Sequence, residues 1–312
     1  GSKRVLTTGG HFGYLKIAEG CDKHCTYCII PKLRGKFRSV PMERLVAQAE
    51  DMAEQGVKEL ILVAQETTVY GKDLYGKKSL HILLKKLCEI RGIRWIRILY
   101  CYPEEIYDEL IETIRDEKKI CHYLDIPIQH ASDRILKRMG RRTSKQELID
   151  IVGKLRKEIP DIVLRTTLIT GFPGETEEDH EELKEFVDEM EFDRLGVFTY
   201  SPEENTPAAE MADQVPEEVK EERRDELMEL QQEISYDRGQ DRIGQELLVM
   251  IEGKVADESA YIGRTYGDAP KVDGYIFVQT GELLMTGDFA KVRVTGALEY
   301  DLIGVLSDEY TE

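Results

Sequence analysis

The sequence lacks a long apolar run, a surplus of positive charge and a second group of cysteines. No stretch of its 312 residues approaches the roughly 18 apolar residues of a membrane-spanning helix, and no charged-then-apolar leader precedes a cleavage site. The net charge of -18 argues against electrostatic binding of nucleic acid phosphates over a broad surface. We therefore expect a cytoplasmic protein without a membrane or nucleic acid partner. A basic protein partner suits this charge better, although acidity can also serve solubility alone.

The length predicts one large domain and one small one, because single cores stop growing at about 250 to 300 residues. Hydrophobic residues at 41% and charged residues at 33% are typical of a globular chain with a true core. The first two residues, Gly1 and Ser2, resemble the remnant of a cleaved tag, so we expect the natural protein to begin upstream.

From Tyr14 to about Tyr200 short β-rich runs alternate with longer amphipathic ones, a pattern typical of repeated βα units around a parallel sheet. The predicted strands are Tyr14–Ala18, Glu59–Ala64, Trp95–Tyr100, His122–Ile126, Ile162–Ile169 and Arg194–Thr199. Six such units predict an α/β fold, an open partial TIM-like (β/α)6 barrel, over residues 1–213.

Residues 214–242 are predicted to form a helical connector, and residues 243–312 a second domain. The second domain should be a small antiparallel β-barrel of the OB-like kind, since short strands there alternate with glycine-containing turns. Its predicted strands are Glu246–Glu252, Ser259–Arg264, Gly274–Val278, Phe289–Thr295 and Leu302–Val305. From Asp241 to Glu312 there are 14 acidic residues against 6 basic ones, so this barrel should be acidic.

The chemistry lies in the run KIAEGCDKHCTYCIIPKLRG, which places Cys21, Cys25 and Cys28 in a C-x3-C-x2-C array directly after the first predicted strand. That position is the C-terminal mouth of the barrel, where active sites are built. Three thiolates on a cubane of four irons leave one iron open for an exchangeable ligand. A zinc site would need a fourth protein ligand in paired spacing, and no second pair is present. The array therefore favours a [4Fe-4S] cluster over zinc.

This loop, with Tyr27 before its last cysteine, resembles the signature of the radical S-adenosylmethionine (SAM) superfamily. The segments LVAQETTVYG, PIQHASDRILKRMGRR, RTTLITGFPGET and FTYSPEENTPA narrow the resemblance to the methylthiotransferases, and the tail resembles their TRAM domain. The resemblance implies that SAM binds the open iron and that one electron cleaves it to a 5'-deoxyadenosyl radical. It also implies a second [4Fe-4S] cluster, held by three cysteines of an N-terminal domain outside this sequence. Cys88, Cys101 and Cys121 lie on separate predicted elements and are not expected to replace them.

The resemblance also implies a set of residues that contact SAM. The amide of Gln65 could accept a bond from the SAM amino group. Arg165 could bind the carboxylate, with an ion pair inside the protein as the alternative. The backbone at Gly171 could pass close to the adenine. The full set of expected contacts is Tyr27, Gln65, Gln129, Ser132, Arg165, Gly171, Phe198 and Tyr200. The last two could flank the adenine, or they could simply be core residues.

Within the methylthiotransferases, one group modifies an aspartate of ribosomal protein S-twelve and another an adenosine of transfer RNA. The segment PIQHAS resembles the first group. The acidic terminal barrel also favours it, because an acidic surface suits a basic protein and repels phosphate. Glu66 departs from the Asp expected there. A methylthio group added to the aspartate β-carbon, with an electron donor such as flavodoxin, is thus the expected activity. This fragment should retain SAM cleavage alone. A transfer RNA enzyme and a ribosome-binding module with a vestigial cluster stay open as alternatives.

Overall fold

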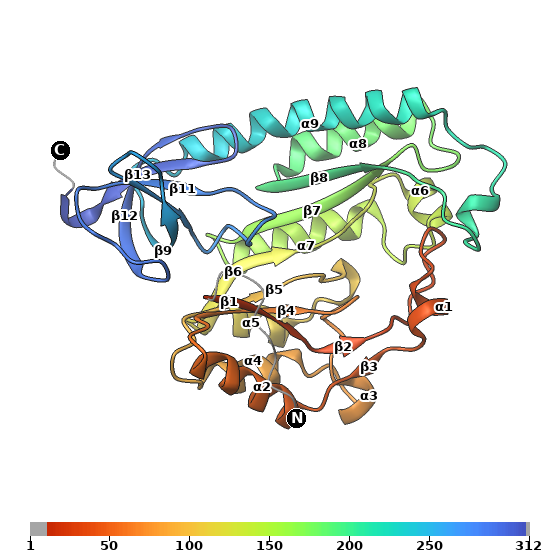
Figure 1. Cartoon of the computed structure of the whole chain (residues 1–312). Helices are drawn as coiled ribbons and strands as arrows, with labels where there is room; N and C mark the ends of the chain where they lie inside the picture. The colour runs from red at the N-terminus through yellow and green to blue at the C-terminus, as the bar shows by residue number, and fades with distance from the viewer. Residues whose placement is uncertain (1–10, 310–312) are drawn as a thin grey trace.

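The structure, a computed structural model, describes residues 11–309, and its larger part is a six-stranded parallel sheet (Figure 1). The strands, in spatial order, are β1 (Phe12–Lys16), β4 (Glu59–Val63), β5 (Trp95–Ile98), β6 (Ile120–Asp125), β7 (Val163–Thr170) and β8 (Arg194–Thr199). Every predicted strand lies within two residues of its expected bounds. Spatial order follows chain order, as repeated right-handed βα units require. The predicted open α/β barrel is confirmed.

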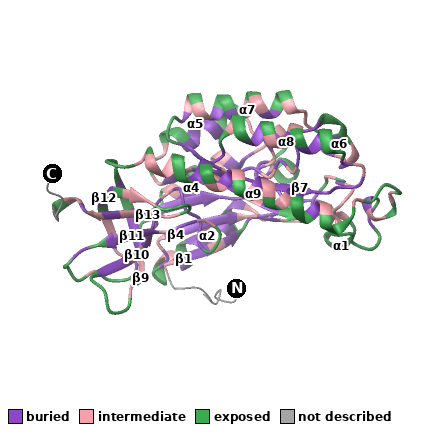
Figure 2. Ribbon diagram, turned by 90° about the horizontal axis from the view of Figure 1, so that it is seen from above, coloured by how far each residue is buried: buried purple, intermediate pink, exposed green. Residues whose placement is uncertain are grey.

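Helices follow the strands of this sheet, and the longer ones cover its outer face. They are α1 (Ile30–Arg34), α2 (Met42–Glu54), α3 (Lys72–Tyr75), α4 (Leu80–Cys88), α5 (Asp108–Asp116), α6 (Asp133–Arg138), α7 (Lys145–Glu158) and α8 (Glu177–Met190). The longer helices have buried inward faces and exposed outward faces, α1 and α3 have no buried residue, and the strands are mostly buried (Figure 2). Thr176 caps α8 in a reciprocal box with Asp179. None of the helices among residues 11–309 is long and apolar enough to cross a membrane.

The helix α9 (Glu217–Gln240) runs along the β8 edge beside α8 and reaches the second, smaller barrel (Figure 1). This barrel is closed, with strands β9 (Glu246–Lys254), β10 (Ala260–Arg264), β11 (Ile276–Gln279), β12 (Phe289–Ala297) and β13 (Leu302–Leu306). Its pairings are antiparallel except β11 with β13, which is parallel. The predicted small barrel is therefore confirmed, and the pairing of β11 with β13 is the one departure from the antiparallel arrangement that we expected.

The small barrel packs against the strand starts of the large sheet, at the end opposite the cysteine loop (Figure 1). Glu59, fully buried at the start of β4, accepts hydrogen bonds from Arg97 at 2.8 Å and from Arg264 of the small barrel at 2.6 Å. Arg97 also donates to the backbone oxygen of Tyr266. A buried charge is tolerated only when paired in this way, so the two barrels share one polar core.

Candidate functional site

The cysteine loop is closed at its base by a short antiparallel pair, β2 (Ala18–Glu19) with β3 (Arg38–Ser39). Cys21 donates its backbone N–H to the oxygen of Gly35, and Asp22 accepts the N–H of Phe37. Gly20 has φ of 77°, and a Cβ at this position would overlap the backbone of residues 35 and 36. Only glycine fits this close crossing of two backbones, so both ends of the loop have fixed positions.

The middle of the loop is held by the turn that follows α6. Thr26 donates its backbone N–H to the oxygen of Met139 and its hydroxyl to the oxygen of Arg138, both at 2.8 Å. Gly140, with φ of 76°, brings this turn against the backbone of His24. The part of His24 that lies against this turn is its backbone oxygen. The three cysteines therefore lie on a loop that is held both at its ends and in its middle.

The three thiols suit a cluster better than a single ion. Cys21 and Cys25 are buried and Cys28 is half-buried. Around one tetrahedral zinc, with bonds of about 2.3 Å, thiolate sulfurs lie about 4 Å apart. Among residues 11–309, the grouping of His, Cys, Asp and Glu ligand atoms within 4.8 Å of one another does not include these cysteines. Burial raises the pKa of Cys21 to about 11, so the thiolate form here needs a bound metal ion to stabilise it.

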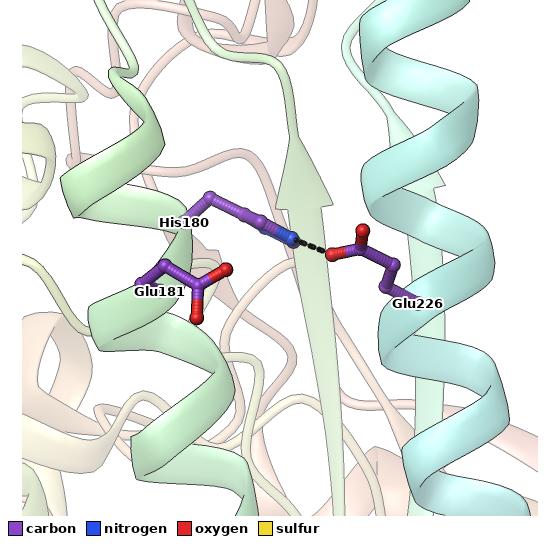
Figure 3. A group of neighbouring side chains, drawn as sticks. All are labelled: His180, Glu181 and Glu226. Atoms are coloured by element: carbon purple, nitrogen blue, oxygen red, sulfur yellow. Dashed lines mark hydrogen bonds and ion pairs between the residues drawn. The ribbon is translucent and has the colours of Figure 1, made fainter.

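The grouping that meets this distance criterion is His180, Glu181 and Glu226, between α8 and α9 (Figure 3). His180 contacts Glu226 at 2.6 Å. The ammonium group of Lys184 lies 3.5 Å from Glu226 and 3.7 Å from Glu181, so a cation already neutralises both carboxylates. We assign no metal to this group, which ties α8 to α9.

After β4, the structure places Glu66 toward the cysteine loop and Gln65 toward solvent. Gln65 is exposed, whereas Glu66 is 2% exposed and interacts electrostatically with Cys21 and Lys23. Burial raises the pKa of Glu66 to about 7, against the opposing effect of Lys23. The buried acceptor at this strand end is therefore a carboxylate rather than the expected amide. The sequence indicates only that a polar residue follows a buried strand here, and both Gln65 and Glu66 fit that description.

Arg165 is held by carboxylates near the start of β7. Its guanidinium group lies 3.1 Å from Asp273, on the loop between β10 and β11, and 3.8 Å from Asp125 at the end of β6. Arg165 thus forms an ion pair inside the protein, which is the alternative role that the sequence allowed for it. Its contact with a SAM carboxylate stays a prediction.

Arg141, which sequence reasoning did not single out, lies closer to the cysteines. It is 6% exposed, its guanidinium stacks 4.4 Å above the ring of Tyr102, and Nη2 donates to the oxygen of Pro127 at 2.7 Å. Its Nε and Nη1 atoms have no hydrogen-bond partner among residues 11–309, and Cys25 and Tyr27 act on it electrostatically. Unpaired buried donors are costly, so Arg141 is suited to an anion beside the cysteine loop.

Gln129 and Ser132 follow β6, as predicted, but their side chains differ in availability. Gln129 has φ of 70°, and its Oε1 atom is buried and finds no hydrogen-bond partner within residues 11–309. Ser132 is already engaged, because its hydroxyl donates to Asp179 at 2.8 Å and accepts the N–H of Ile135 as the cap of α6. The Gln129 amide is thus the freer of the two expected contacts.

The remaining expected contacts form a small aromatic group around the turn after β7. Tyr27 and Tyr200 both pack edge-on against Phe172, with ring centroids 6.3 Å and 5.4 Å away. Gly171 begins this turn with φ of 70°. Phe198, which we expected beside the adenine, is 58% exposed. The structure brings Tyr27, Gly171 and Tyr200 together and leaves Phe198 at the surface.

Comparison with known proteins identifies the superfamily and both domains. The radical SAM superfamily profile matches residues 15–187, and the TRAM domain profile matches residues 243–306. The chain is 68% identical over 303 residues to the ribosomal protein uS12 methylthiotransferase RimO of Lachnoclostridium phytofermentans, covering 97% of this chain and 69% of that protein. It is 56% identical over 306 residues to the RimO protein of Clostridium perfringens, covering 98% and 68%.

Two solved structures have a similar fold. Coproporphyrinogen III oxidase (HemN) from Escherichia coli, a radical SAM enzyme, has a TM-score of 0.56 and 17% identity, covering 91% of this chain and 66% of that one. The radical SAM methyltransferase TsrM from Kitasatospora setae has a TM-score of 0.54 and 17% identity, covering 64% and 39%. At these identities the likeness shows the fold alone.

Proposed function

We propose, on the premise that this chain belongs to the radical SAM superfamily and within it to the uS12 methylthiotransferases, that it adds a methylthio group to the β-carbon of an aspartate in uS12. The relatives of that name cover almost the whole chain at high identity. An acidic small barrel and the text PIQHAS support this substrate over transfer RNA. The observation that carries the proposal is one anchored loop presenting three thiols at the C-terminal end of a parallel sheet.

The cofactors of this family are a [4Fe-4S] cluster and SAM, and Cys21, Cys25 and Cys28 would hold the cluster. Three protein ligands leave one iron open for SAM. When bound, the cluster would supply one electron for the reductive cleavage of SAM. The protein's own contribution is to bind and orient SAM and to exclude water.

We assign the amino acid part of SAM to Glu66 and Arg141. Ionised Glu66 can accept hydrogen bonds from the SAM ammonium group, and it is buried on the cysteine side of the sheet. Arg141 offers two unpaired buried donors to the SAM carboxylate. Charge-assisted hydrogen bonds of this kind are each worth about 1.5–3 kcal/mol. Gln129 can bind the ribose through its unpaired Oε1 only if a ribose hydroxyl donates to it.

Tyr27 and Gly171 would border the adenine, with Tyr200 behind them. We propose the division into residues 1–213, 214–242 and 243–312 for the radical SAM domain, connector and TRAM domain, supported by the position of α9. An electron donor such as flavodoxin would reduce the cluster.

A second cluster would require cysteines outside this sequence. Cys88 lies on α4, Cys101 follows β5 and Cys121 lies on β6, and within residues 11–309 none of them belongs to a group of ligand atoms within 4.8 Å of one another. We expect residues 1–312 to bind and cleave SAM without completing methylthiolation. Full turnover of uS12 by this chain alone, detected by mass spectrometry, would contradict that expectation.

The proposed activity is tested by anaerobic reconstitution with iron and sulfide, followed by a 5'-deoxyadenosine assay under reducing conditions. We expect 5'-deoxyadenosine from the unmodified chain and none from Cys21→Ala, with Cys88→Ala as the matched control that retains activity. Equal product from the unmodified chain and Cys21→Ala would refute the radical mechanism. A pull-down from an equal mixture of uS12 and transfer RNA separates the two substrates, because an acidic barrel should retain the basic protein and repel the RNA phosphates.

A further inference from the structure

His130 is completely buried between the two loops that carry the expected SAM contacts. One loop follows β6 and contains Gln129 and Ser132. The other is the turn after β7, from Gly171 to Thr176. The imidazole of His130 lies between them, and its two nitrogens bond to different loops.

The backbone determines which nitrogen of His130 carries the proton. Nδ1 accepts the N–H groups of Ala131 and Ser132, both at 3.0 Å. An imidazole nitrogen that accepts hydrogen bonds has no proton, so the proton of the neutral ring is on Nε2. Nε2 lies 2.8 Å from Oε2 of Glu175 and therefore donates to it.

Glu175 connects His130 to two further donors. Its Oε1 accepts the N–H of Gly171 at 3.0 Å and Nη1 of Arg223 at 2.7 Å. Burial acts to raise the pKa of Glu175, but the bonds from His130, Gly171 and Arg223 outweigh it and lower the pKa. The carboxylate is therefore ionised at neutral pH, and both of its oxygens are engaged.

Arg223 extends this chain of bonds to α9. The same Nη1 atom also donates to the backbone oxygen of Glu175 at 3.1 Å. One turn earlier on α9, the backbone oxygen of Lys220 accepts the hydroxyl of Thr170. A Cβ at Gly171 would overlap the Lys220 side chain, so α9 packs directly on the turn. The loop after β6, the turn after β7 and α9 thus share one buried ionic group.

We propose that His130 is a positioning residue for SAM, which through Glu175 and Arg223 holds the loop of Gln129 in register with the turn of Gly171. This inference rests on the proposed function. Gln129 has a left-handed backbone conformation, which is unfavourable for a residue with a side chain and persists only where its surroundings impose it. The two backbone N–H groups bound by His130 belong to Ala131 and Ser132, two and three residues after Gln129, so the imidazole fixes the backbone next to Gln129 and supplies that constraint.

Two substitutions separate the two halves of the role. In His130→Asn the side-chain oxygen can still accept the backbone N–H groups, but the bond to Glu175 is lost. In His130→Gln the amide can still donate to Glu175, but the backbone acceptor is lost. We expect each variant to bind SAM about tenfold more weakly by equilibrium dialysis after reconstitution, with iron and sulfide content unchanged. His122→Asn, a half-exposed histidine paired with Asp161, is the matched control and should bind SAM normally.

A double-mutant cycle tests the connection to α9. If His130 acts through Glu175, then His130→Asn and Arg223→Met should be non-additive, the double variant losing less SAM affinity than the product of the two single losses. A simple packing role predicts independent effects. Additive losses would overturn the proposed connection.

Nitrogen NMR of the cluster-free chain gives a readout independent of SAM. We expect His130 to have the Nε2–H tautomer, unchanged when Arg223 is replaced by methionine. A proton on Nδ1, or normal SAM affinity in both folded His130 variants, would refute the positioning role and leave the proposed function intact. If the unmodified, reconstituted chain bound no SAM, the proposed function and this inference would both fail.

Discussion

Replacing the buried carboxyl group of Glu66 by an amide should make the protein more stable and weaken its binding of SAM. Glu66 is 2% exposed, and burial raises its pKa from 4.5 to about 7. Glu66→Gln keeps the shape and the acceptor oxygen for the hydroxyl of Thr68, which bonds Glu66 at 3.1 Å, but it cannot ionise. The substitution therefore isolates the free energy of placing a charge at this point.

The magnitude follows from the two pKa values of Glu66. Between about pH 4.5 and 7 the folded protein keeps a proton that the unfolded chain has lost, so its stability falls as pH rises through this window. Each pH unit is worth about 1.4 kcal/mol, which gives a loss of about 3 kcal/mol above pH 7. The amide variant does not suffer this loss. At pH 8 its free energy of unfolding should exceed that of the unmodified chain by up to about 3 kcal/mol.

Urea denaturation of the cluster-free chain at pH 5 and pH 8, followed by circular dichroism, measures this difference. We expect the variant's advantage to be small at pH 5 and large at pH 8. SAM affinity should fall about 10- to 100-fold, because a charge-assisted bond to the ammonium group is lost. An advantage of equal size at both pH values, or a variant less stable at pH 8, would refute the reasoning.

Three further substitutions test other parts of the molecule. Glu59→Gln removes the carboxylate that pairs with the fully buried guanidinium of Arg97 and should lower the free energy of unfolding by about 3–5 kcal/mol in urea, and a loss below about 1 kcal/mol would contradict a shared polar core. Gly171→Ala should lower it by about 2–4 kcal/mol, from backbone strain and overlap with Lys220, and Lys220→Ala should partly restore it. Arg141→Met should weaken SAM binding about 10- to 100-fold in dialysis at unchanged iron content, and normal affinity would exclude Arg141 from the carboxylate site.

The strands, helices and cysteine loop were predictable because their signals are local. Alternating apolar residues, caps such as Thr176 and the C-x3-C-x2-C spacing depend on neighbours within a few positions. In the small barrel the one parallel pairing was missed, since β11 and β13 are far enough apart in sequence that no turn dictates their direction.

Local sequence does not determine which of two neighbouring or chemically similar side chains faces the site. Gln65 and Glu66 both follow β4, and which one faces the cysteines depends on where the strand ends and how the chain turns. Arg165 and Arg141 are equally plausible anion receptors in the sequence, yet Asp273, 108 residues beyond Arg165, neutralises it in the fold. Long-range contacts of this kind leave no periodic signal.

The cluster ligands of this protein can thus be predicted from a short run of sequence, because three thiols within eight residues can reach one cluster from a single loop. The partners of its charged groups were decided by tertiary packing. A buried charge is unfavourable unless a counter-charge lies beside it. That counter-charge often comes from a segment far away in the sequence, as Arg264 does for Glu59 and Arg223 for Glu175.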